Sequence, residues 1–238
     1  MLQQLKEEVL QANLMLPKTG LVLFTWGNVS GIDREAGLVV IKPSGVPYER
    51  LQVDDMVVCD LNGNVVEGAL RPSSDLATHI YLYQVFPHIG GVTHTHSLYA
   101  TSFAQSGRGI VPYGTTHADY FDGEIPCTRK MKKAEIAGAY EKNTGFVIAQ
   151  RFTNIDPDRM HAVLVHSHGP FTWGATPQES VDASVVLENV AHLAMNTELL
   201  QHTAECSSQH PMQQSLLRRH FDRKHGPNAY YGQKKTRA

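Results

Sequence analysis

Two short histidine motifs in this 238-residue chain could bind a metal ion together. His94 and His96 flank Thr95 in the first motif, and His168 follows His166 and Ser167 in the second. On a strand, residues two apart point to the same face, so His94 and His96 could converge on one cation. Either motif alone is more typical of a strand end or a turn. Their combination, each beside an apolar run, predicts a divalent-metal site.

Asp75 adds a carboxylate at the start of the helix expected before the first motif. Three nitrogens with one carboxylate or substrate oxygen are typical of a catalytic site that keeps an exchangeable position. The set contains no cysteine, so Zn²⁺, Mn²⁺ and Co²⁺ all suit it. His166 is ambiguous, and a packing or supporting role beside His168 is favoured. Six other histidines lack such company and are predicted to be structural or surface residues: His79, His88, His161, His192, His202 and His210.

Three short polar loops beside apolar runs could bind an anion through backbone amides and hydroxyls. They span Trp26–Ser30, Lys42–Gly45 and Pro72–Ser74. The serine pair of the third loop sits where a helix N-terminus would attract phosphate. Each loop alone also fits ordinary turn or capping chemistry. None is a Walker or GxGxxG motif, so nucleotide binding has no support.

Short elements separated by turns must position these side chains. An amphipathic helix over 2–16 should end at Pro17 and Gly20, and Asn62-Gly63 indicates a hairpin. Serine and acidic residues open a helix at 73–75, and prolines open the last two helices. The remaining expectations are strands at 21–25, 38–41, 56–59, 90–96 and 161–166, a short helix from Leu98, and helices over 177–204 and 211–225. Together they predict one α+β domain over residues 1–238.

The composition narrows the class of protein. Hydrophobic residues make up 42% and charged residues 18%, with a formal net charge of -2, so nothing favours nucleic acid or anionic membranes. Lys6, Glu7 and Glu8 interrupt any signal-peptide core, and no apolar run could span a bilayer. The three cysteines form no disulfide framework, which favours a reducing cytoplasm. They are Cys59, Cys127 and Cys206.

Read in order, the motifs resemble the class II aldolase family over nearly the whole chain. Within it they are similar to the sugar-phosphate 4-epimerases that interconvert L-ribulose 5-phosphate and D-xylulose 5-phosphate. The regions 146–160 and 195–210 diverge, and residues 234–238 extend past the usual end as a tail expected to be flexible. The matching segments are 25–30, 41–46, 72–75, 94–97, 114–120, 125–129, 166–171 and 223–233.

The resemblance implies a three-layer α/β/α fold around a mainly antiparallel sheet, in a homotetramer with active sites between subunits. It implies one Zn²⁺ per subunit and a sugar-phosphate substrate. Asp119 and Tyr231 match the acid–base residues, the tyrosine reaching in from a neighbouring chain, and His220 and Arg223 match positions near that interface. The implied metal ligands are Asp75, His94, His96 and His168. The implied phosphate site comprises Gly27, Asn28, Ser44, Gly45, Ser73 and Ser74, with Lys42 close by.

The expected chemistry follows from the position of the inverted carbon. C4 of a ketopentose phosphate is not adjacent to the carbonyl, so simple deprotonation cannot invert it. C4 can be inverted if the C3–C4 bond breaks, the aldehyde fragment turns over and the bond re-forms. A class II aldolase that releases dihydroxyacetone phosphate and an aldehyde is the nearest alternative, although Asp75 replaces the glutamate common in those enzymes. A second alternative is a non-catalytic assembly module like the adducin head domain. Such a protein can dispense with the metal ligands, but all four are present here.

Overall fold

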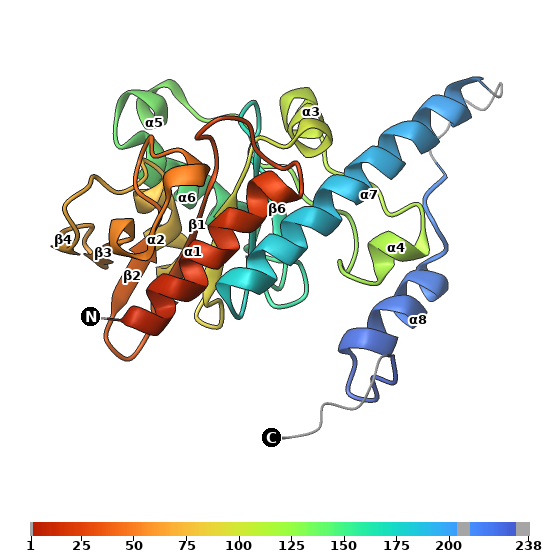
Figure 1. The fold of residues 1–238 in the computed structure, drawn as a ribbon. Helices are drawn as coiled ribbons and strands as arrows, with labels where there is room; N and C mark the ends of the chain where they lie inside the picture. Colours follow the sequence, from red (N-terminus) through yellow and green to blue (C-terminus); the bar gives the residue numbers. More distant parts are fainter. Residues whose placement is uncertain (1, 204–209, 232–238) are drawn as a thin grey trace.

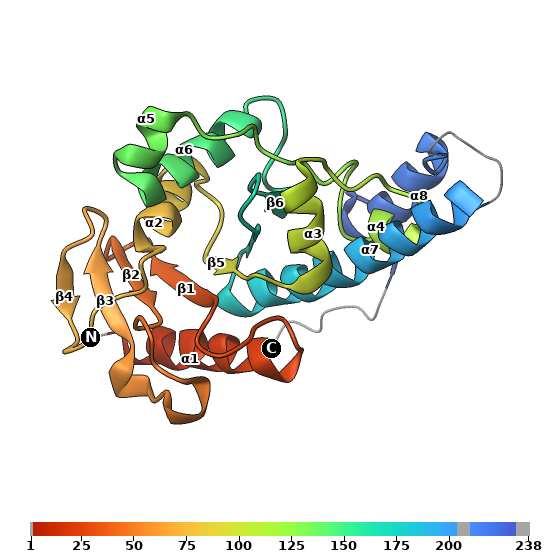
Figure 2. The ribbon, with the colours of Figure 1, turned by 90° about the horizontal axis from the view of Figure 1, so that it is seen from above.

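A seven-stranded sheet forms the centre of the computed structural model, which describes residues 2–203 and 210–231 (Figures 1 and 2). The strand order is β4-β3-β2-β1-β5-β7-β6, and every neighbouring pair is antiparallel. The expectation of a mainly antiparallel sheet is therefore confirmed. The strands are β1 (Asn28–Asp33), β2 (Leu38–Ile41), β3 (Val57–Asp60), β4 (Val65–Glu67), β5 (Gly91–His94), β6 (Ala162–Leu164) and β7 (Pro170–Gly174).

Helices cover both faces of this sheet, as predicted for three layers. On one face lie α1 (Gln3–Lys18) and the first turns of α7 (Pro177–Thr203); on the other lie α2 (Leu76–Val85) and α6 (Tyr140–Arg151) (Figure 2). Because side chains alternate along a strand, each central strand supplies both cores. Val40 and Val58 pack with α1, whereas their neighbours Val39 and Val57 pack with α2.

The C-terminal half of α7 extends beyond the sheet, and α8 (Gln214–His225) lies beside the short helix α4 (Thr115–Ala118) (Figure 1). Two other short elements complete the helices, α3 (Leu98–Ser106) and α5 (Lys133–Ala137). Among the described residues no helix has the length and apolarity that crossing a membrane requires. Cys206 and the predicted tail over 234–238 lie outside the described residues.

Several predicted elements differ from the observed ones. The apolar run 21–25 is a turn rather than a strand, since Phe24 has a left-handed φ of 52° and the Trp26 amide donates to the Leu23 carbonyl at 3.0 Å. Pro17 lies inside the last turn of α1, which ends at Lys18 before Gly20. The predicted strand 90–96 ends at His94. Strands β1 and β7 and helices α4, α5 and α6 were not predicted, because their apolar periodicity is short or weak. The predicted loop Trp26–Ser30 instead runs into β1, which begins at Asn28.

Candidate metal centre and active site

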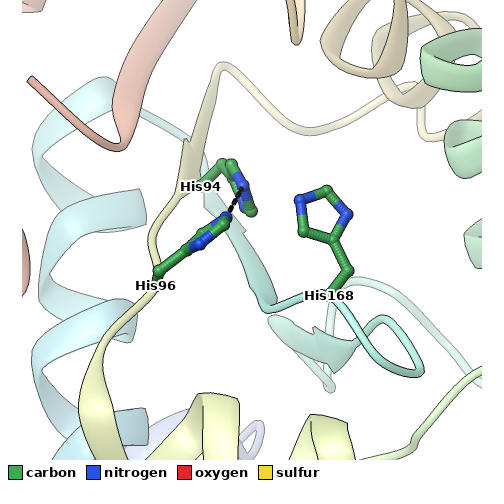
Figure 3. A group of neighbouring side chains, drawn as sticks. All are labelled: His94, His96 and His168. Carbon is green, nitrogen blue, oxygen red and sulfur yellow. Dashed lines mark hydrogen bonds between the residues drawn. The ribbon is translucent and has the colours of Figure 1, made fainter.

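Three imidazoles meet at the C-terminal end of the central strand β5 (Figure 3). His94 is the last residue of β5, His96 follows it two residues later, and His168 lies in the turn between β6 and β7. One ligand atom from each ring lies within 4.8 Å of the other two, and the Nε2 atoms of His94 and His96 are 3.0 Å apart. The structure thus brings together the three predicted histidines. His166 instead pairs with the Ser167 hydroxyl at 2.7 Å.

The backbone around His168 allows the three imidazoles to approach one another. Ser167 adopts a left-handed φ of 61°, a conformation that costs a residue with a Cβ roughly 1–2 kcal/mol. At Gly169, an added Cβ would lie 2.7 Å from the Thr95 carbonyl and 3.3 Å from the His96 ring. Only glycine therefore leaves room for the imidazoles to approach one another. The strained turn and the glycine together place His168 opposite the other two rings.

The hydrogen bonds of these rings suit a divalent cation. The Nδ1–H of His94 donates to the Pro170 carbonyl at 2.9 Å, so Nε2 of His94 carries the lone pair, and it lies 3.0 Å from Nε2 of His96. Nδ1 of His168 lies 3.3 Å from the Tyr140 hydroxyl, which leaves its Nε2 as the remaining ligand atom. Burial, together with His94 and His96, lowers the pKa of His168 to about 3. Its ring is therefore neutral at neutral pH, the state in which imidazole binds a metal.

Asp75 lies near this group but outside it in the part of the chain that the structure describes. It precedes the first turn of α2, and its Oδ2 accepts a hydrogen bond of 2.7 Å from the Asn28 amide. Burial would raise the pKa of this carboxyl, but the nearby His94 and His79 rings and Asn28 outweigh it, so the pKa lies below its ordinary value. Asp75 is thus an anion at the margin of the three imidazoles, where a bound cation would attract it.

A single cavity of about 390 Å³ contains both predicted constellations. Its lining residues come from segments far apart in the sequence, and they include the predicted metal ligands and the predicted anion-binding residues. They are Thr25, Trp26, Gly27, Asn28, Lys42, Pro43, Ser44, Gly45, Ser73, Ser74, Asp75, His94, His96, Tyr140, Glu141 and His168. The geometry therefore presents cation-binding and anion-binding groups to one small molecule.

Lys42 gives the cavity its positive charge. Its side chain is 1% exposed, and its ammonium contacts only neutral groups: the Thr25 and Pro43 carbonyls at 3.3 and 3.4 Å and the Tyr48 ring at 4.8 Å. None of the ion pairs among the described residues involves Lys42. Burial lowers its pKa to about 8. A buried cation without a carboxylate partner is costly, and an anionic ligand would offset that cost.

Some residues that shape the cavity were not identified from the sequence. Tyr140 and Glu141 line it from the start of α6, a helix that carries no recognised motif. Tyr48 holds the loop before β1 by donating to the Trp26 and Gly27 carbonyls at 2.8 and 3.0 Å. No local signal identifies these tyrosines, because their roles depend on contacts with residues more than 20 positions away.

Asp119 and Tyr231 do not line this cavity. The Asp119 carboxylate is held by the predicted neighbours His220, at 2.9 Å from Nδ1, and Arg223, at 2.7 Å from Nη2, while Lys224 lies at 3.6 Å. Tyr231 is 60% exposed, and its ring packs against the Arg223 guanidinium at 4.8 Å. The two predicted acid–base residues therefore lie on either side of Arg223, in a second cluster built from α4, α8 and the segment that follows.

Comparisons with known proteins agree on one family. The model of the "Class II Aldolase and Adducin N-terminal domain" matches residues 7–195. L-ribulose-5-phosphate 4-epimerases named UlaF, from Salmonella paratyphi B and Salmonella typhi, are 54% identical over 98% of this chain and all of theirs. A solved L-fuculose 1-phosphate aldolase shares the fold with a TM-score of 0.71, at 26% identity over 90% of this chain and 94% of that one.

Replacing His94 should greatly weaken metal binding. We expect His94→Ala to weaken Co²⁺ affinity by more than about 100-fold, because it removes a buried ligand whose ring is already oriented by Pro170. The measurement is competition with a chromophoric chelator. His88→Ala is the matched control, since His88 is exposed and paired with Asp158. Equal affinity in both variants would contradict the site.

Proposed function

The chain belongs to the class II aldolase and adducin family, and within it we propose an L-ribulose-5-phosphate 4-epimerase that forms D-xylulose 5-phosphate. One observation carries this proposal: three converging histidines and the buried Lys42 ammonium line the same cavity. A sugar phosphate needs both, a cation at its carbonyl end and a positive site at its phosphate. The 54% identity to epimerases, against 26% to a solved aldolase, favours epimerisation.

We assign the cation site to His94, His96 and His168, with Asp75 as fourth ligand. Zn²⁺, one per subunit, suits this set, and Mn²⁺ or Co²⁺ suits it also. When bound, such an ion supplies a Lewis acid that stabilises negative charge on the substrate oxygens. The protein's own part is to bring the three rings together and to orient them.

The phosphate would lie against the polar loops that line the same cavity. There Lys42 supplies the charge, and the loops supply hydroxyl and amide donors. At Gly27 an added Cβ would lie 2.9 Å from the His94 carbonyl, so this position requires glycine. The proposed phosphate-binding residues are Gly27, Asn28, Lys42, Ser44, Gly45, Ser73 and Ser74.

The reaction requires a proton to leave and return at the C4 oxygen. A base removes it, the C3–C4 bond breaks, and its electron pair passes into the three-carbon fragment. After the aldehyde has turned, the bond re-forms, and an acid returns the proton. We assign these transfers to Asp119 and Tyr231. Burial would raise the pKa of Asp119, but Arg223 and His220 outweigh it, so Asp119 is ionised at neutral pH.

A neighbouring subunit must then supply these groups. Within one chain Asp119 and Tyr231 lie beside Arg223 rather than in the cavity. We propose a cytoplasmic homotetramer in which this cluster completes the cavity of an adjacent subunit. Its partners would be small sugar phosphates and copies of itself, not nucleic acid or membranes.

The function can be tested by incubating the purified protein with L-ribulose 5-phosphate and measuring D-xylulose 5-phosphate in a coupled assay. We expect epimerisation that a chelator abolishes and added Zn²⁺ restores, without accumulation of free aldehyde. Conversion of L-fuculose 1-phosphate to dihydroxyacetone phosphate and an aldehyde, with no epimerisation, would instead identify an aldolase.

Lys42→Met should weaken binding of inorganic phosphate, measured as competitive inhibition, by about 10-fold or more, because it removes a charge-assisted contact. In the unmodified chain the same affinity should fall as pH rises through about 8, since the buried amine loses its proton there. Lys142→Met is the control, because Lys142 is exposed and lines a separate cavity behind Ser73 and Ser74. An equal effect of both changes would argue against a Lys42 phosphate site.

Mixed oligomers test whether subunits share active sites. His94→Ala and Tyr231→Phe chains should each be inactive, but co-expressed chains should recover about a quarter of the normal activity if the cavity and the tyrosine come from adjacent copies. Placing both changes in one chain, mixed with a His94→Ala chain, should give no recovery. Absence of recovery in the first mixture, with tetramers verified by mass, would mean that each chain forms its own site.

A further inference from the structure

His96 is the one of the three converging histidines whose position the sheet does not explain. His94 is the last residue of β5 and lies in the ladder, and His168 lies in the turn that leads into β7. His96 instead lies in the short connection from β5 to α3 (Figure 3). In this connection the Thr95 amide lies 3.4 Å from the Pro170 carbonyl, which is longer than most hydrogen bonds in proteins. The contacts that hold the start of α3 therefore also bear on the position of His96.

A carboxylate from α7 holds the first turn of α3. The two oxygens of Glu188 accept hydrogen bonds from the backbone N–H groups of Tyr99, at 2.8 Å, and of Ala100, at 2.9 Å. In the first turn of a helix such N–H groups have no carbonyl partner within the helix. Ser97 stands at the N-cap, a position where serine is preferred, but it makes no capping hydrogen bond through its side chain. Glu188 thus caps α3 in place of the local residue.

A ring contact ties the same turn to α7 a second time. The Tyr99 ring stacks on the His192 ring, with centroids 3.8 Å apart and an angle of 5° between the planes. Glu188 and His192 are one helical turn apart and therefore lie on the same side of α7. Helix α7 also packs against β5 and β7. It thus links the start of α3 to the two strands that adjoin the other histidines.

The short spacing makes this anchor relevant to His96. Two residues separate His96 from Tyr99, whose N–H group Glu188 holds. The connection is thus held at both ends, by the sheet at His94 and by the capped turn at Tyr99. Because the connection is short, releasing the capped turn would let the imidazole of His96 move away from the other two rings.

We propose that Glu188 is a positioning residue for the metal site: it caps α3 and thereby keeps the His96 ring within reach of His94 and His168. This role rests on the proposed assignment of these histidines as metal ligands. Glu188 itself is not a ligand in this arrangement, because backbone N–H groups occupy both of its oxygens. Groups that orient metal ligands change the metal affinity about 10–100-fold when they are removed.

The test is the Co²⁺ affinity of the full-length chain, measured by chelator competition, together with the visible spectrum of the bound ion. Glu188→Ala removes both acceptors. We expect about 10–100-fold weaker binding, with a spectrum altered by the displaced imidazole. Glu188→Gln keeps one carbonyl oxygen for the N–H groups of the turn and should lose less affinity than Glu188→Ala.

A double-mutant cycle with His96 separates positioning from a general loss of stability. His96→Ala removes the imidazole that Glu188 is proposed to hold. In a His96→Ala chain, Glu188→Ala should cause no further loss of Co²⁺ affinity, because no imidazole is left to misplace. An equal fold-loss in both backgrounds would overturn the proposal, since a general loss of stability acts whether or not His96 is present.

A second carboxylate cap provides the matched control. Glu179 accepts a hydrogen bond of 2.9 Å from the Ala175 N–H group, just before α7 and beyond the end of β7 that lies away from His168. Glu179→Ala should lower the unfolding temperature but leave the Co²⁺ affinity and spectrum unchanged. A merely structural Glu188 would give this same result in Glu188→Ala.

The outcomes distinguish this inference from the proposed function. Normal Co²⁺ affinity and spectrum in folded Glu188→Ala would overturn the role of Glu188 and leave the epimerase proposal standing. Absence of Co²⁺ binding to the unmodified chain would overturn both. If Glu188→Ala does not fold, Glu188→Gln decides: several-fold weaker binding supports the role, and unchanged binding overturns it.

Discussion

The register of three adjacent strands is the constraint on which the site depends. Asn28 of β1 pairs with His94 of β5, and His94 pairs with Phe171 of β7. These pairings place the amide that holds Asp75, the first of the three converging imidazoles and the ring stacked on it in one row across the sheet. Backbone hydrogen bonds fix the position of His94 in this row, and His96 and His168 lie in the segments that follow β5 and precede β7.

The cavity combines groups that suit a cation with a group that suits an anion. The three imidazoles and the Asp75 carboxylate offer lone pairs to a cation, whereas Lys42 offers a positive charge that no ion pair among the described residues neutralises. Burying these groups is costly while they lack a partner of opposite charge, since burial removes water from groups that need it. A substrate that brings a phosphate and a carbonyl group would satisfy both sets at once. Under the proposed function, the strain at Ser167 and the burial of Lys42 would serve binding rather than stability.

The sequence was most informative where chemistry and spacing coincide. His94, His96 and His168 could be grouped because each motif adjoins an apolar strand. The assignment of the polar loops to a phosphate site came from the family resemblance. The run 21–25 misled because two of its apolar residues lie exposed at a turn: Leu23 is 63% exposed and Phe24 is 80% exposed. Tyr140 and Tyr48 could not be found, since their contacts join distant segments. His79, predicted to be a structural or surface residue, is buried against Ser30, a contact that no local pattern reveals.

Two side chains on one face of strand β1 hold residues beside the cavity. Asn28 and Ser30 point to the same face, the first toward Asp75 and the second toward His79. A single inserted or deleted residue between them would turn one of these side chains to the α1 face, where Asn13 already bonds the intervening Val29. An insertion or deletion is thus barred in this strand, whereas the exposed β3–β4 hairpin can absorb one.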